Sequence, residues 1–428
     1  MASPGVSVFE YVRLTRENLN FRKLWFAQIV SEIGDWFYTI AIFSLLLDLT
    51  GRAESVALGL VLWVLPQTFV GPIAGAVNDR ISRRKVMIAA DLARTVIVGC
   101  MLFVRSASMA WLIYPLIFLE TVMAGFFEPA RNSVIPNITP ESDIILANTL
   151  ASTTWSFNLA IGSLIGGVVA ATLGRKAVFV INALSFLVSA AFISRMRFDE
   201  PHITHQRLTL REVFDYSPMV EGFRYIGHDL RMLAMVSLRG GGGILGASWV
   251  LYPVFGQRVL PMPDLGRQDY AIVGMSILLA GRGFGALMGP LLASPWAGIN
   301  QKRLRRGVLV GFILGGIGYV LLGVAPNIWA AAAFVFLGHI GGSTVWVFST
   351  TLLQLNSDDR FRGRIFAADF GICMAVIALS AWLSGQAIDH GISPRIVASS
   401  VGASMMIPTI LWASAQRLWV EKSGEAKV

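Results

Sequence analysis

The chain has 428 residues, of which 55% are hydrophobic and 14% are charged, and its formal net charge at pH 7 is +9. Soluble globular domains carry about 25% charged residues, so this composition excludes an ordinary soluble enzyme and indicates a protein with many membrane spans. The positive charge does not indicate a nucleic-acid partner, because the Lys and Arg residues gather in short segments between apolar runs. The two cysteines, Cys100 and Cys373, fall within such runs and predict no disulfide framework.

Apolar runs long enough to cross a hydrocarbon core of roughly 30 Å recur along the chain. They predict an all-α membrane protein with twelve transmembrane helices, at residues 24–48, 54–78, 86–104, 109–130, 144–172, 177–195, 232–257, 269–294, 307–324, 327–353, 364–388 and 394–416. These spans predict a cytoplasmic N-terminal segment (1–23), a first six-helix bundle (24–196), a cytoplasmic linker (197–231), a second six-helix bundle (232–416) and a cytoplasmic tail (417–428).

The positions of the 35 Lys and Arg residues predict the orientation of the spans. Most of them lie on the side of the linker and of both termini, and the positive-inside rule assigns that side to the cytoplasm. We therefore expect an integral protein of the plasma (inner) membrane with cytoplasmic termini. Residues 1–23 have no apolar core and no small-residue cleavage site, so we expect no signal peptide. In the linker, residues 208–225 are moderately amphipathic and predict a surface helix.

The loop between the second and third spans, residues 75–85, has a distinctive sequence, GAVNDRISRRK. It begins with Gly75 and carries one acid followed by four cations: Asp79, Arg80, Arg83, Arg84 and Lys85. It resembles motif A of the major facilitator superfamily, Gly-x-x-x-Asp-Arg-x-Gly-basic-basic, which lies between the same two spans. Ser82 stands where the family usually has Gly. The resemblance extends over residues 20–417 and implies the major facilitator fold, with two pseudo-symmetric six-helix bundles.

In that family the acid of the loop docks on the start of span 11 and closes the cytoplasmic side. The resemblance therefore implies a cytoplasmic gate in which Asp79 meets the helix dipole of span 11 together with Arg362 and Arg364. The other residues of this gate are Gly75, Arg80, Arg83 and Arg84. The alternative is a loop whose cations only hold this side in the cytoplasm, but such a loop has no need of an acid at that spacing.

Two acids lie inside the first span. Glu32 and Asp35 are about 12 and 16 Å from its start at 1.5 Å per residue, near the middle of the membrane. Their i,i+3 spacing puts them on one helix face, where repulsion between two ionised carboxylates favours proton binding by one of them. Proton-driven drug exporters of the superfamily often carry acids in this span, and this pair resembles that arrangement. The alternative is a structural pair neutralised by cations of spans 4, 7 or 8.

Other charged residues also fall inside predicted spans, where an ionisable group usually faces a cavity or a partner. Asp91 and Arg94, and likewise Glu128 and Arg131, have the spacing of local ion pairs. In the family, spans 1, 4, 7 and 10 line the cavity. The resulting candidates for proton coupling or for the cavity, beside the pair of span 1, are Glu120, Arg239, Arg282, His339 and Asp369. For His339, the alternative to titration is a structural hydrogen bond.

Two glycine-containing segments raise separate expectations. Residues 162–167, GSLIGG, resemble the end of the antiporter motif of span 5, with Ser163 in place of Pro, although small residues also permit close helix contact. The Arg-containing motif of span 4 is missing, because the run before Gly125 reads ETVMA. A cationic partner for the span 1 acids must therefore come from elsewhere. In span 7, four consecutive glycines predict a break or hinge: Gly240, Gly241, Gly242 and Gly243.

The sequence contains no phosphate-binding loop, zinc-ligand spacing or nucleophile elbow, so we expect no enzyme, cofactor or metal site. The motifs most resemble the bacterial efflux branch that includes siderophore and macrolide exporters. We interpret the chain as a monomeric secondary transporter in the lipid bilayer that exports a small amphipathic molecule in exchange for protons. Two alternatives remain: an importer or lysophospholipid flippase of the same fold, and a non-transporting membrane sensor or scaffold.

Overall fold

The computed structural model describes residues 8–78, 80–200, 217–227, 229–262, 267–298, 300–357 and 359–419, and these residues form helices and short connections only. The predicted all-α membrane fold is confirmed. The chain packs into two compact units, one made of Met1–Ala41 with Phe69–Asp215, and the other of Ile42–Thr68 with Tyr216–Val428. The hairpin 42–68 was predicted within the first bundle, but its residues pack with the second unit.

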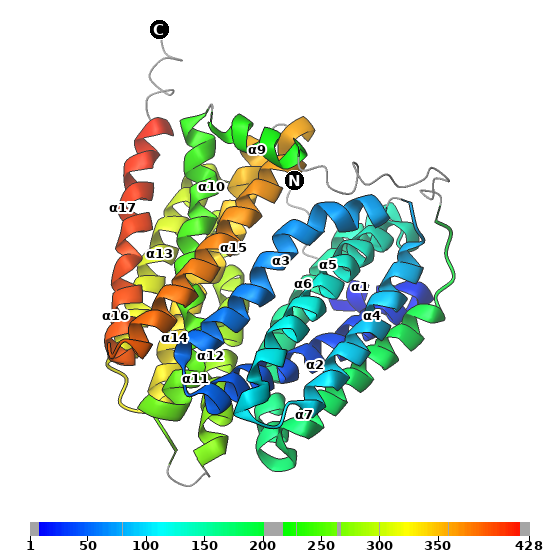
Figure 1. Ribbon diagram of the computed structural model, residues 1–428. Helices are drawn as coiled ribbons and strands as arrows, with labels where there is room; N and C mark the ends of the chain where they lie inside the picture. Colours follow the sequence, from blue (N-terminus) through cyan, green and yellow to red (C-terminus); the bar gives the residue numbers. More distant parts are fainter. Residues whose placement is uncertain are drawn as a thin grey trace. The chain divides into compact units, whose positions relative to one another are not determined.

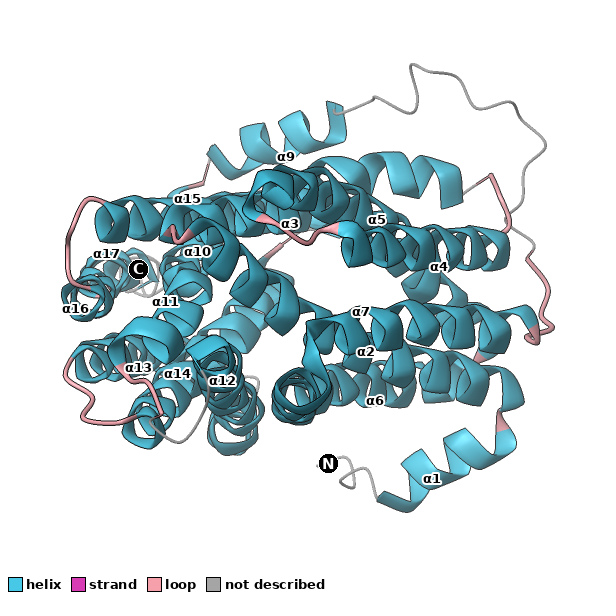
Figure 2. Cartoon of the chain, turned by 60° about the horizontal axis from the view of Figure 1, so that its bottom comes forward, coloured by secondary structure: helices cyan, strands magenta, loops and turns pink. Residues whose placement is uncertain are grey.

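The first unit contains the helices of the N-terminal part of the chain, which are labelled in Figure 2. They are α1 (Val8–Glu17), α2 (Leu19–Thr50), α3 (Ala53–Asn78), α4 (Arg83–Cys100), α5 (Ile113–Ile138), α6 (Ile144–Phe157) and α7 (Ser163–Ser194), with α2 and α3 continuing into the second unit. Gly174, at φ 78°, divides α7 into two segments. The predicted boundary between spans 5 and 6 lies at this glycine, which can adopt a left-handed backbone conformation at little cost.

The second unit contains the remaining helices (Figure 1). They are α9 (Ser217–Gly227), α10 (Leu230–Gly243), α11 (Ser248–Val254), α12 (Arg267–Ala297), α13 (Gln301–Gly323), α14 (Ile328–Asn356), α15 (Asp359–Asp389), α16 (Pro394–Ser404) and α17 (Met406–Ala415). Glycines let α13 and α14 pack closely: a Cβ added at Gly341 would lie 2.2 Å from the carbonyl oxygen of Gly311. Helix α9 falls within the linker that was predicted to hold a surface helix.

Within the described part of the chain, ten helical stretches are long and apolar enough to cross a membrane. One of them, Glu141–Ser194, includes the break at Gly174 and accounts for two predicted spans. The predicted span 7 is not among the ten, because it is interrupted: a 3-10 segment, Ile244–Ala247, separates α10 from α11. The ten stretches, the divided one counted twice, and this interrupted span correspond to the twelve predicted spans.

Candidate functional site

The intramembrane charges of the first unit meet at Arg94 in α4. Its Nη2 lies 2.8 Å from Oδ2 of Asp35 in α2, and its Nε lies 3.1 Å from Oε1 of Glu120 in α5. Asp91, one turn earlier in α4, has its Oδ1 3.6 Å from Nη1 of Arg94. The guanidinium carbon also lies 3.8 Å from the ring centroid of Phe186. We call Asp35, Asp91, Arg94 and Glu120 the acid cluster.

The carboxylates of the acid cluster differ in their access to solvent. The side chain of Asp91 is 0% exposed and that of Glu120 is 5% exposed, whereas that of Asp35 is 34% exposed. Among the described residues, no side chain lies within normal hydrogen-bond geometry of either carboxylate oxygen of Asp91. Three ionised carboxylates around one guanidinium would leave two negative charges uncompensated, and an unpaired buried ion is penalised by several kcal/mol. The arrangement therefore favours proton binding, and Asp35 is the member that solvent reaches.

Glu32 lies in a separate cluster, although it shares a helix face with Asp35. Its Oε1 accepts a hydrogen bond from Gln28 Nε2 at 2.7 Å and lies 3.3 Å from Nη1 of Arg131. Its Oε2 accepts from Nδ2 of Asn158 at 2.9 Å. Arg131 also pairs with Glu128 at 2.7 Å, as the spacing of the two residues predicted. The two acids of span 1 thus have different cationic partners, one in α4 and one in α5.

A π-helical turn brings Asn158 to Glu32. Residues Asn158–Gly162 form this turn between α6 and α7, and insertions of this kind often occur at functional sites. The following glycines pack against α2: a Cβ at Gly166 would lie 2.9 Å from Cδ1 of Phe37. The segment that resembles the antiporter motif is therefore a close contact with α2. Neither Asn158 nor Gln28 was predicted as a site residue, although each is a polar residue within an apolar run.

In the second unit, Arg239 of α10 forms a closed ion pair. It contacts Asp369 of α15, and both side chains are almost completely buried. Arg239 also donates to the hydroxyl of Thr350 in α14, and its guanidinium carbon lies 4.4 Å from the ring centroid of Trp346. Arg239 and Asp369, which were predicted as separate cavity residues, thus pair with each other.

Arg282 of α12 has a different environment. Its Nη1 donates to the hydroxyl of Ser248 at 3.2 Å, and its guanidinium carbon lies 4.4 Å from the ring centroid of Trp249. The residue is half-buried, and no carboxylate of the described residues forms an ion pair with it. A charged side chain at membrane depth costs roughly 2.5–3.5 kcal/mol, so a cation in this position is expected to face water or a ligand.

His339 belongs to a buried hydrogen-bonded triad. Its Nε2 lies 3.1 Å from the hydroxyl of Tyr252 in α11 and 3.0 Å from the hydroxyl of Tyr319 in α13. The two tyrosine hydroxyls lie 2.9 Å apart. The triad ties α11 to α13 and α14, and Tyr252 lies one turn after Ser248 on the same face of α11. These contacts agree with the alternative that His339 makes a structural hydrogen bond, and its partners are the hydroxyl groups of the two tyrosines.

The glycine run of span 7 is helical in this structure. Helix α10 continues through Gly243, and the break begins one residue later, at Ile244. A Cβ at Gly241 would lie 2.6 Å from Cβ of Pro408, whereas at Gly242 the nearest atom, Cγ1 of Val345, would be 3.8 Å away. Close packing explains Gly241 better than a hinge does, and the interruption that was predicted at the glycines lies next to them.

The motif loop is described only in part, because Asp79 and the side chain of Arg362 lie outside the described residues. Ser82 caps α4, since its hydroxyl accepts from the backbone N–H of Lys85 at 3.3 Å. Arg83 donates to the carbonyl of Ser133 at 2.8 Å. A serine in place of the family's usual glycine therefore has a local function as a helix cap.

The other gate residues have separate surroundings. Gly75 has no atom within 4 Å of an added Cβ, and Arg80 donates to the carbonyl of Ala76 at 3.3 Å. Arg84 donates to the carbonyl of Ser194, and Arg364 pairs with Glu221 of α9. The contact of Arg364 links the start of α15 to the linker helix. Because Asp79 and the side chain of Arg362 lie outside the described residues, the gate stays a prediction.

At the opposite end of α15, a carboxylate caps another helix. Asp389 accepts hydrogen bonds from the backbone N–H groups of Ala53 and Glu54 at 2.9 and 2.8 Å, so it satisfies the free donors at the start of α3. In the same hairpin, Oδ1 of Asp48 accepts from Nε2 of Gln257 at 2.5 Å. These contacts hold the hairpin 42–68 within the second unit. We call them the hairpin clamp.

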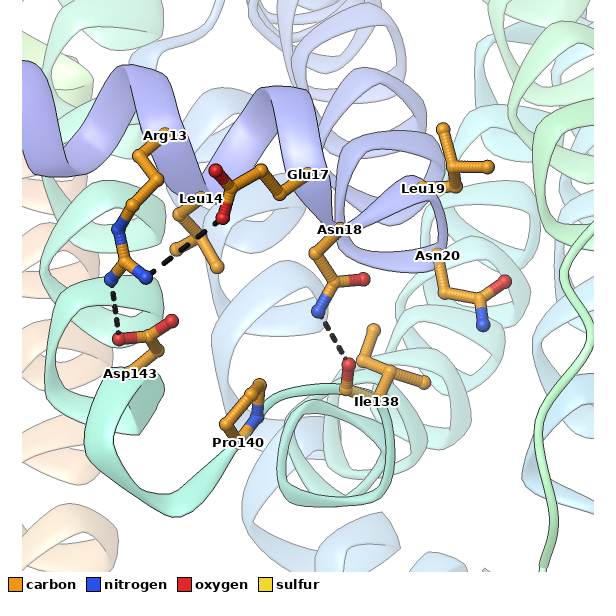
Figure 3. A pocket seen from close by; sticks show the side chains of 9 residues that line it. All are labelled: Arg13, Leu14, Glu17, Asn18, Leu19, Asn20, Ile138, Pro140 and Asp143. Carbon is orange, nitrogen blue, oxygen red and sulfur yellow. Dashed lines mark hydrogen bonds and ion pairs between the residues drawn. The ribbon is translucent and has the colours of Figure 1, made fainter.

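A pocket of about 490 Å³ lies outside the apolar spans, between α1, the start of α2 and the end of α5 (Figure 3). Arg13 spans it and pairs with Asp143 at 2.8 Å, and Nδ2 of Asn18 donates to the carbonyl of Ile138 at 2.6 Å. These contacts attach α1 to the first unit. Within the described ranges, no group of three His, Cys, Asp or Glu side chains is arranged to hold a metal ion.

The comparison with protein families identifies the chain. Residues 24–381 match the Major Facilitator Superfamily model. The chain belongs to the major facilitator superfamily. It is thus a membrane transporter and not an enzyme, as the sequence predicted.

Several relatives share most of the length of this major facilitator protein. It is 27% identical over 362 residues to BacE of Bacillus subtilis, a candidate bacilysin exporter, covering 83% of this chain and 86% of that one. It is 23% identical to macrolide efflux protein A of Streptococcus pyogenes, covering 87% and 90%. It is 24% identical to the multidrug efflux pump Tap of Mycolicibacterium fortuitum, covering 85% and 88%.

Solved structures agree on the fold. The nucleoside transporter NupG superposes with a TM-score of 0.70 at 12% identity, covering 93% of this chain and 99% of that one. A bacterial homologue of the lysosomal transporter Spinster superposes with a TM-score of 0.65 at 13% identity, covering 93% and 95%. At these identities the likeness concerns the arrangement of helices and carries no information on substrate.

Proposed function

We propose that this major facilitator protein exports a small amphipathic compound in exchange for protons, by alternating access. The observation that carries the proposal is the acid cluster, in which three carboxylates share the guanidinium of Arg94 and one of them, Asp35, is 34% exposed. The direction of transport is supported by the relatives, since those named for macrolide and multidrug efflux match most of the chain.

In the proposed cycle, Asp35 receives and releases the proton. Protonation removes the charge that pairs Asp35 with Arg94 at 2.8 Å, and Arg94 keeps its remaining contacts with Glu120 and Asp91. Asp35 lies in α2 and Arg94 lies in α4, so an ion pair links these two helices only when Asp35 is ionised. A bound proton can shift a conformational equilibrium only through such a difference between states.

Glu32 is a second proton site in this proposal. Its carboxylate already has one cation, Arg131, and two amide donors, Gln28 and Asn158. These partners stabilise the ionised form, so its proton exchange contributes less than that of Asp35. The main support for assigning coupling to Asp35 is therefore the larger excess of acid around Arg94, which has three carboxylates, whereas Arg131 has two, those of Glu32 and Glu128.

The remaining expectations complete the proposal. Both termini lie in the cytoplasm, the protein acts as a monomer, and the motif loop closes the cytoplasmic side through Asp79 and the start of α15. Arg364, at the start of α15, pairs with Glu221 of the linker helix. Cysteine labelling at position 363 from the cytoplasm tests the gate: Asp79→Asn should increase labelling, and unchanged labelling with normal transport would reduce the loop to a determinant of orientation.

Reconstituted vesicles test the proposal as a whole. With the cytoplasmic face outward and an acidic lumen, an amphipathic dye that carries a carboxylate, such as fluorescein, should accumulate inside to a higher level than in vesicles without protein, and a protonophore should abolish the difference. Proton-driven loss of dye from such vesicles would instead support the importer or flippase reading. Absence of protein-dependent movement in either direction would favour a sensor or scaffold.

A further inference from the structure

The environment of Arg282 distinguishes it from the other intramembrane cations. Arg94 has three carboxylates and Arg239 has one, each within ion-pairing distance. Arg282 lies near the middle of α12, beside the hydroxyls of Ser248 and Tyr252 and the aromatic face of Trp249. In the described ranges of the chain, no acid neutralises it. A fixed positive charge therefore remains available within the second unit.

The hydrogen-bonding groups of Arg282 are only partly used. A guanidinium has five N–H donors, and one nitrogen of Arg282 donates to Ser248. None of its nitrogens is among the buried, unpartnered polar atoms found in the described residues, whereas Nε of Arg239 is. The N–H groups that Arg282 does not use are thus reachable by solvent or by a ligand. A stacked guanidinium keeps its edge free, and that edge matches the two oxygens of a carboxylate.

Apolar aromatic rings adjoin the cation. Trp249 lies with its ring centroid 5.0 Å from that of Trp63 and 6.1 Å from that of Phe43, both edge to face. Phe43 and Trp63 belong to the hairpin 42–68, which packs within the second unit and is held there by the hairpin clamp. A charged edge beside aromatic rings is suited to a molecule that has an anionic group and an apolar part.

The buried triad fixes this arrangement. Tyr252, bonded to Tyr319 and His339, lies one turn from Ser248 and three residues from Trp249 on α11. Helix α11 follows the 3-10 segment Ile244–Ala247, so it depends on such contacts for its position. The residues of the triad are positioning residues for the two groups that contact Arg282.

We propose that Arg282, with Trp249 and Ser248, recognises a carboxylate on an amphipathic compound that this protein transports. The inference rests on the proposed transport function and adds the class of substrate: an organic anion with an aromatic or apolar group beside the carboxylate. The guanidinium binds the carboxylate, and the half-buried ring of Trp63 contacts the apolar part, while Trp249, which is 4% exposed, packs against the guanidinium. The positive charge of Arg282 complements the negative charge of the carboxylate, and no acid of the described residues competes for it.

Equilibrium binding to the purified full-length protein tests this site. The probes are N-acetyl-L-phenylalanine and its neutral amide, N-acetyl-L-phenylalaninamide, which differ in the charged group alone, and binding is followed by tryptophan fluorescence without a pH gradient. The wild type should bind the acid about tenfold more tightly than the amide. Arg282→Gln should abolish that preference with little change in amide binding, and Arg282→Lys should retain part of it, since a lysine keeps the charge but not the fork.

The controls separate recognition from folding. Arg105→Gln removes an exposed cation of the first unit and should leave the preference for the acid unchanged. Thermal unfolding is measured for every variant, and Arg282→Gln should unfold close to the wild-type temperature. Equal binding of acid and amide by the wild type, binding of neither, or a preference that survives in Arg282→Gln would overturn the proposal. If Arg282→Gln alone unfolds early and Arg282→Lys binds both probes equally, Arg282 is a structural cation and the proposal also fails.

The outcome is independent of proton coupling. Loss of pH-driven dye accumulation in Asp35→Asn, together with an intact preference for the acid, would support both proposals. A protein that binds the acid through Arg282 yet moves no dye on a proton gradient would contradict proton-coupled export while leaving the anion site in place. The reverse result, transport without any preference for the acid, would contradict only the site.

Discussion

In the first unit, carboxylates of α2, α4 and α5 surround the single guanidinium of Arg94. In the described part of the second unit, Arg239 has one carboxylate and Arg282 has none. The same kind of group, an intramembrane arginine, thus has an excess of acid in one unit and a deficit in the other. An excess of acid is relieved by protons, and a deficit is relieved by an anion. The difference suggests that the first unit handles protons and the second unit handles substrate.

The largest effect should come from removing the cation of the acid cluster. Arg94→Gln leaves Asp35, Asp91 and Glu120 without a countercharge, and breaking a buried ion pair typically costs about 3–5 kcal/mol. We expect a strong fall in thermal stability, measured by unfolding in detergent. Arg105→Gln, at an exposed position, should stay within about 0.5 kcal/mol of the wild type. Equal stability of Arg94→Gln and Arg105→Gln would mean that the acids of the acid cluster do not need Arg94 as a countercharge, and would contradict the proposed excess of acid in the first unit.

The next effect separates coupling from folding. Asparagine at position 35 is polar and has the same size as aspartate, and the position is half-exposed, so the fold should persist in Asp35→Asn. The pH-driven accumulation of fluorescein should fall to the level of empty vesicles. Glu141→Gln, which removes an exposed carboxylate outside the spans, should accumulate dye at the wild-type rate. If Asp35→Asn still accumulates dye on a proton gradient, coupling lies elsewhere, and Glu32 and Glu120 are the next residues to test.

A matched pair of glycine variants tests how the second unit is built around its cations. Gly241→Ala places a Cβ 2.6 Å from that of Pro408 and should destabilise the protein by about 1–3 kcal/mol. Gly242→Ala meets nothing nearer than 3.8 Å and should be neutral or stabilising by up to about 1 kcal/mol. Thermal unfolding distinguishes the two. Similar effects at both positions would mean that packing against α17 is not what requires glycine here.

Much of this architecture could be predicted from the sequence, because membrane spans depend on the length of apolar runs and orientation depends on the placement of cations. The partners of the buried charges could not. Arg94 was predicted to pair with Asp91, three residues away, and that contact exists, but its shortest contacts are with Asp35 and Glu120 on other helices. Such contacts depend on helix rotation, which a single sequence does not specify.

The position of the break in span 7 likewise depends on tertiary contacts that a single sequence does not specify. Consecutive glycines lower helix propensity by about 1 kcal/mol each, and that reasoning placed the interruption at Gly240 to Gly243. Tertiary contacts with Pro408 and with the backbone of α15 at Cys373 favour glycine there for lack of space, and the helix continues. The 3-10 segment Ile244–Ala247 begins directly after them. Close packing accounts for glycine at positions 241 and 243, and a hinge at this run stays a prediction.

The smallest effect concerns the hairpin clamp, which keeps Phe43 and Trp63 in the second unit. Asp389→Ala removes the cap of α3, and loss of such a cap costs about 1 kcal/mol. We expect slightly lower thermal stability and, because the aromatic rings are held less firmly, a weaker preference for N-acetyl-L-phenylalanine over its amide. His390→Ala, at the exposed neighbouring position, should change neither. No change in Asp389→Ala would mean that the other hairpin contacts suffice.

Infrared difference spectroscopy of the purified protein tests the central claim most directly, because the C=O stretch of a protonated carboxyl group is separate from that of a carboxylate. If the acid cluster holds protons, the wild type should show a protonated carboxyl band near neutral pH that disappears as the pH rises. The band should be reduced in Asp35→Asn and unchanged in Glu141→Gln. The absence of any such band in the folded wild-type protein, or a band equally strong in Asp35→Asn, would contradict the assignment of proton binding to this cluster.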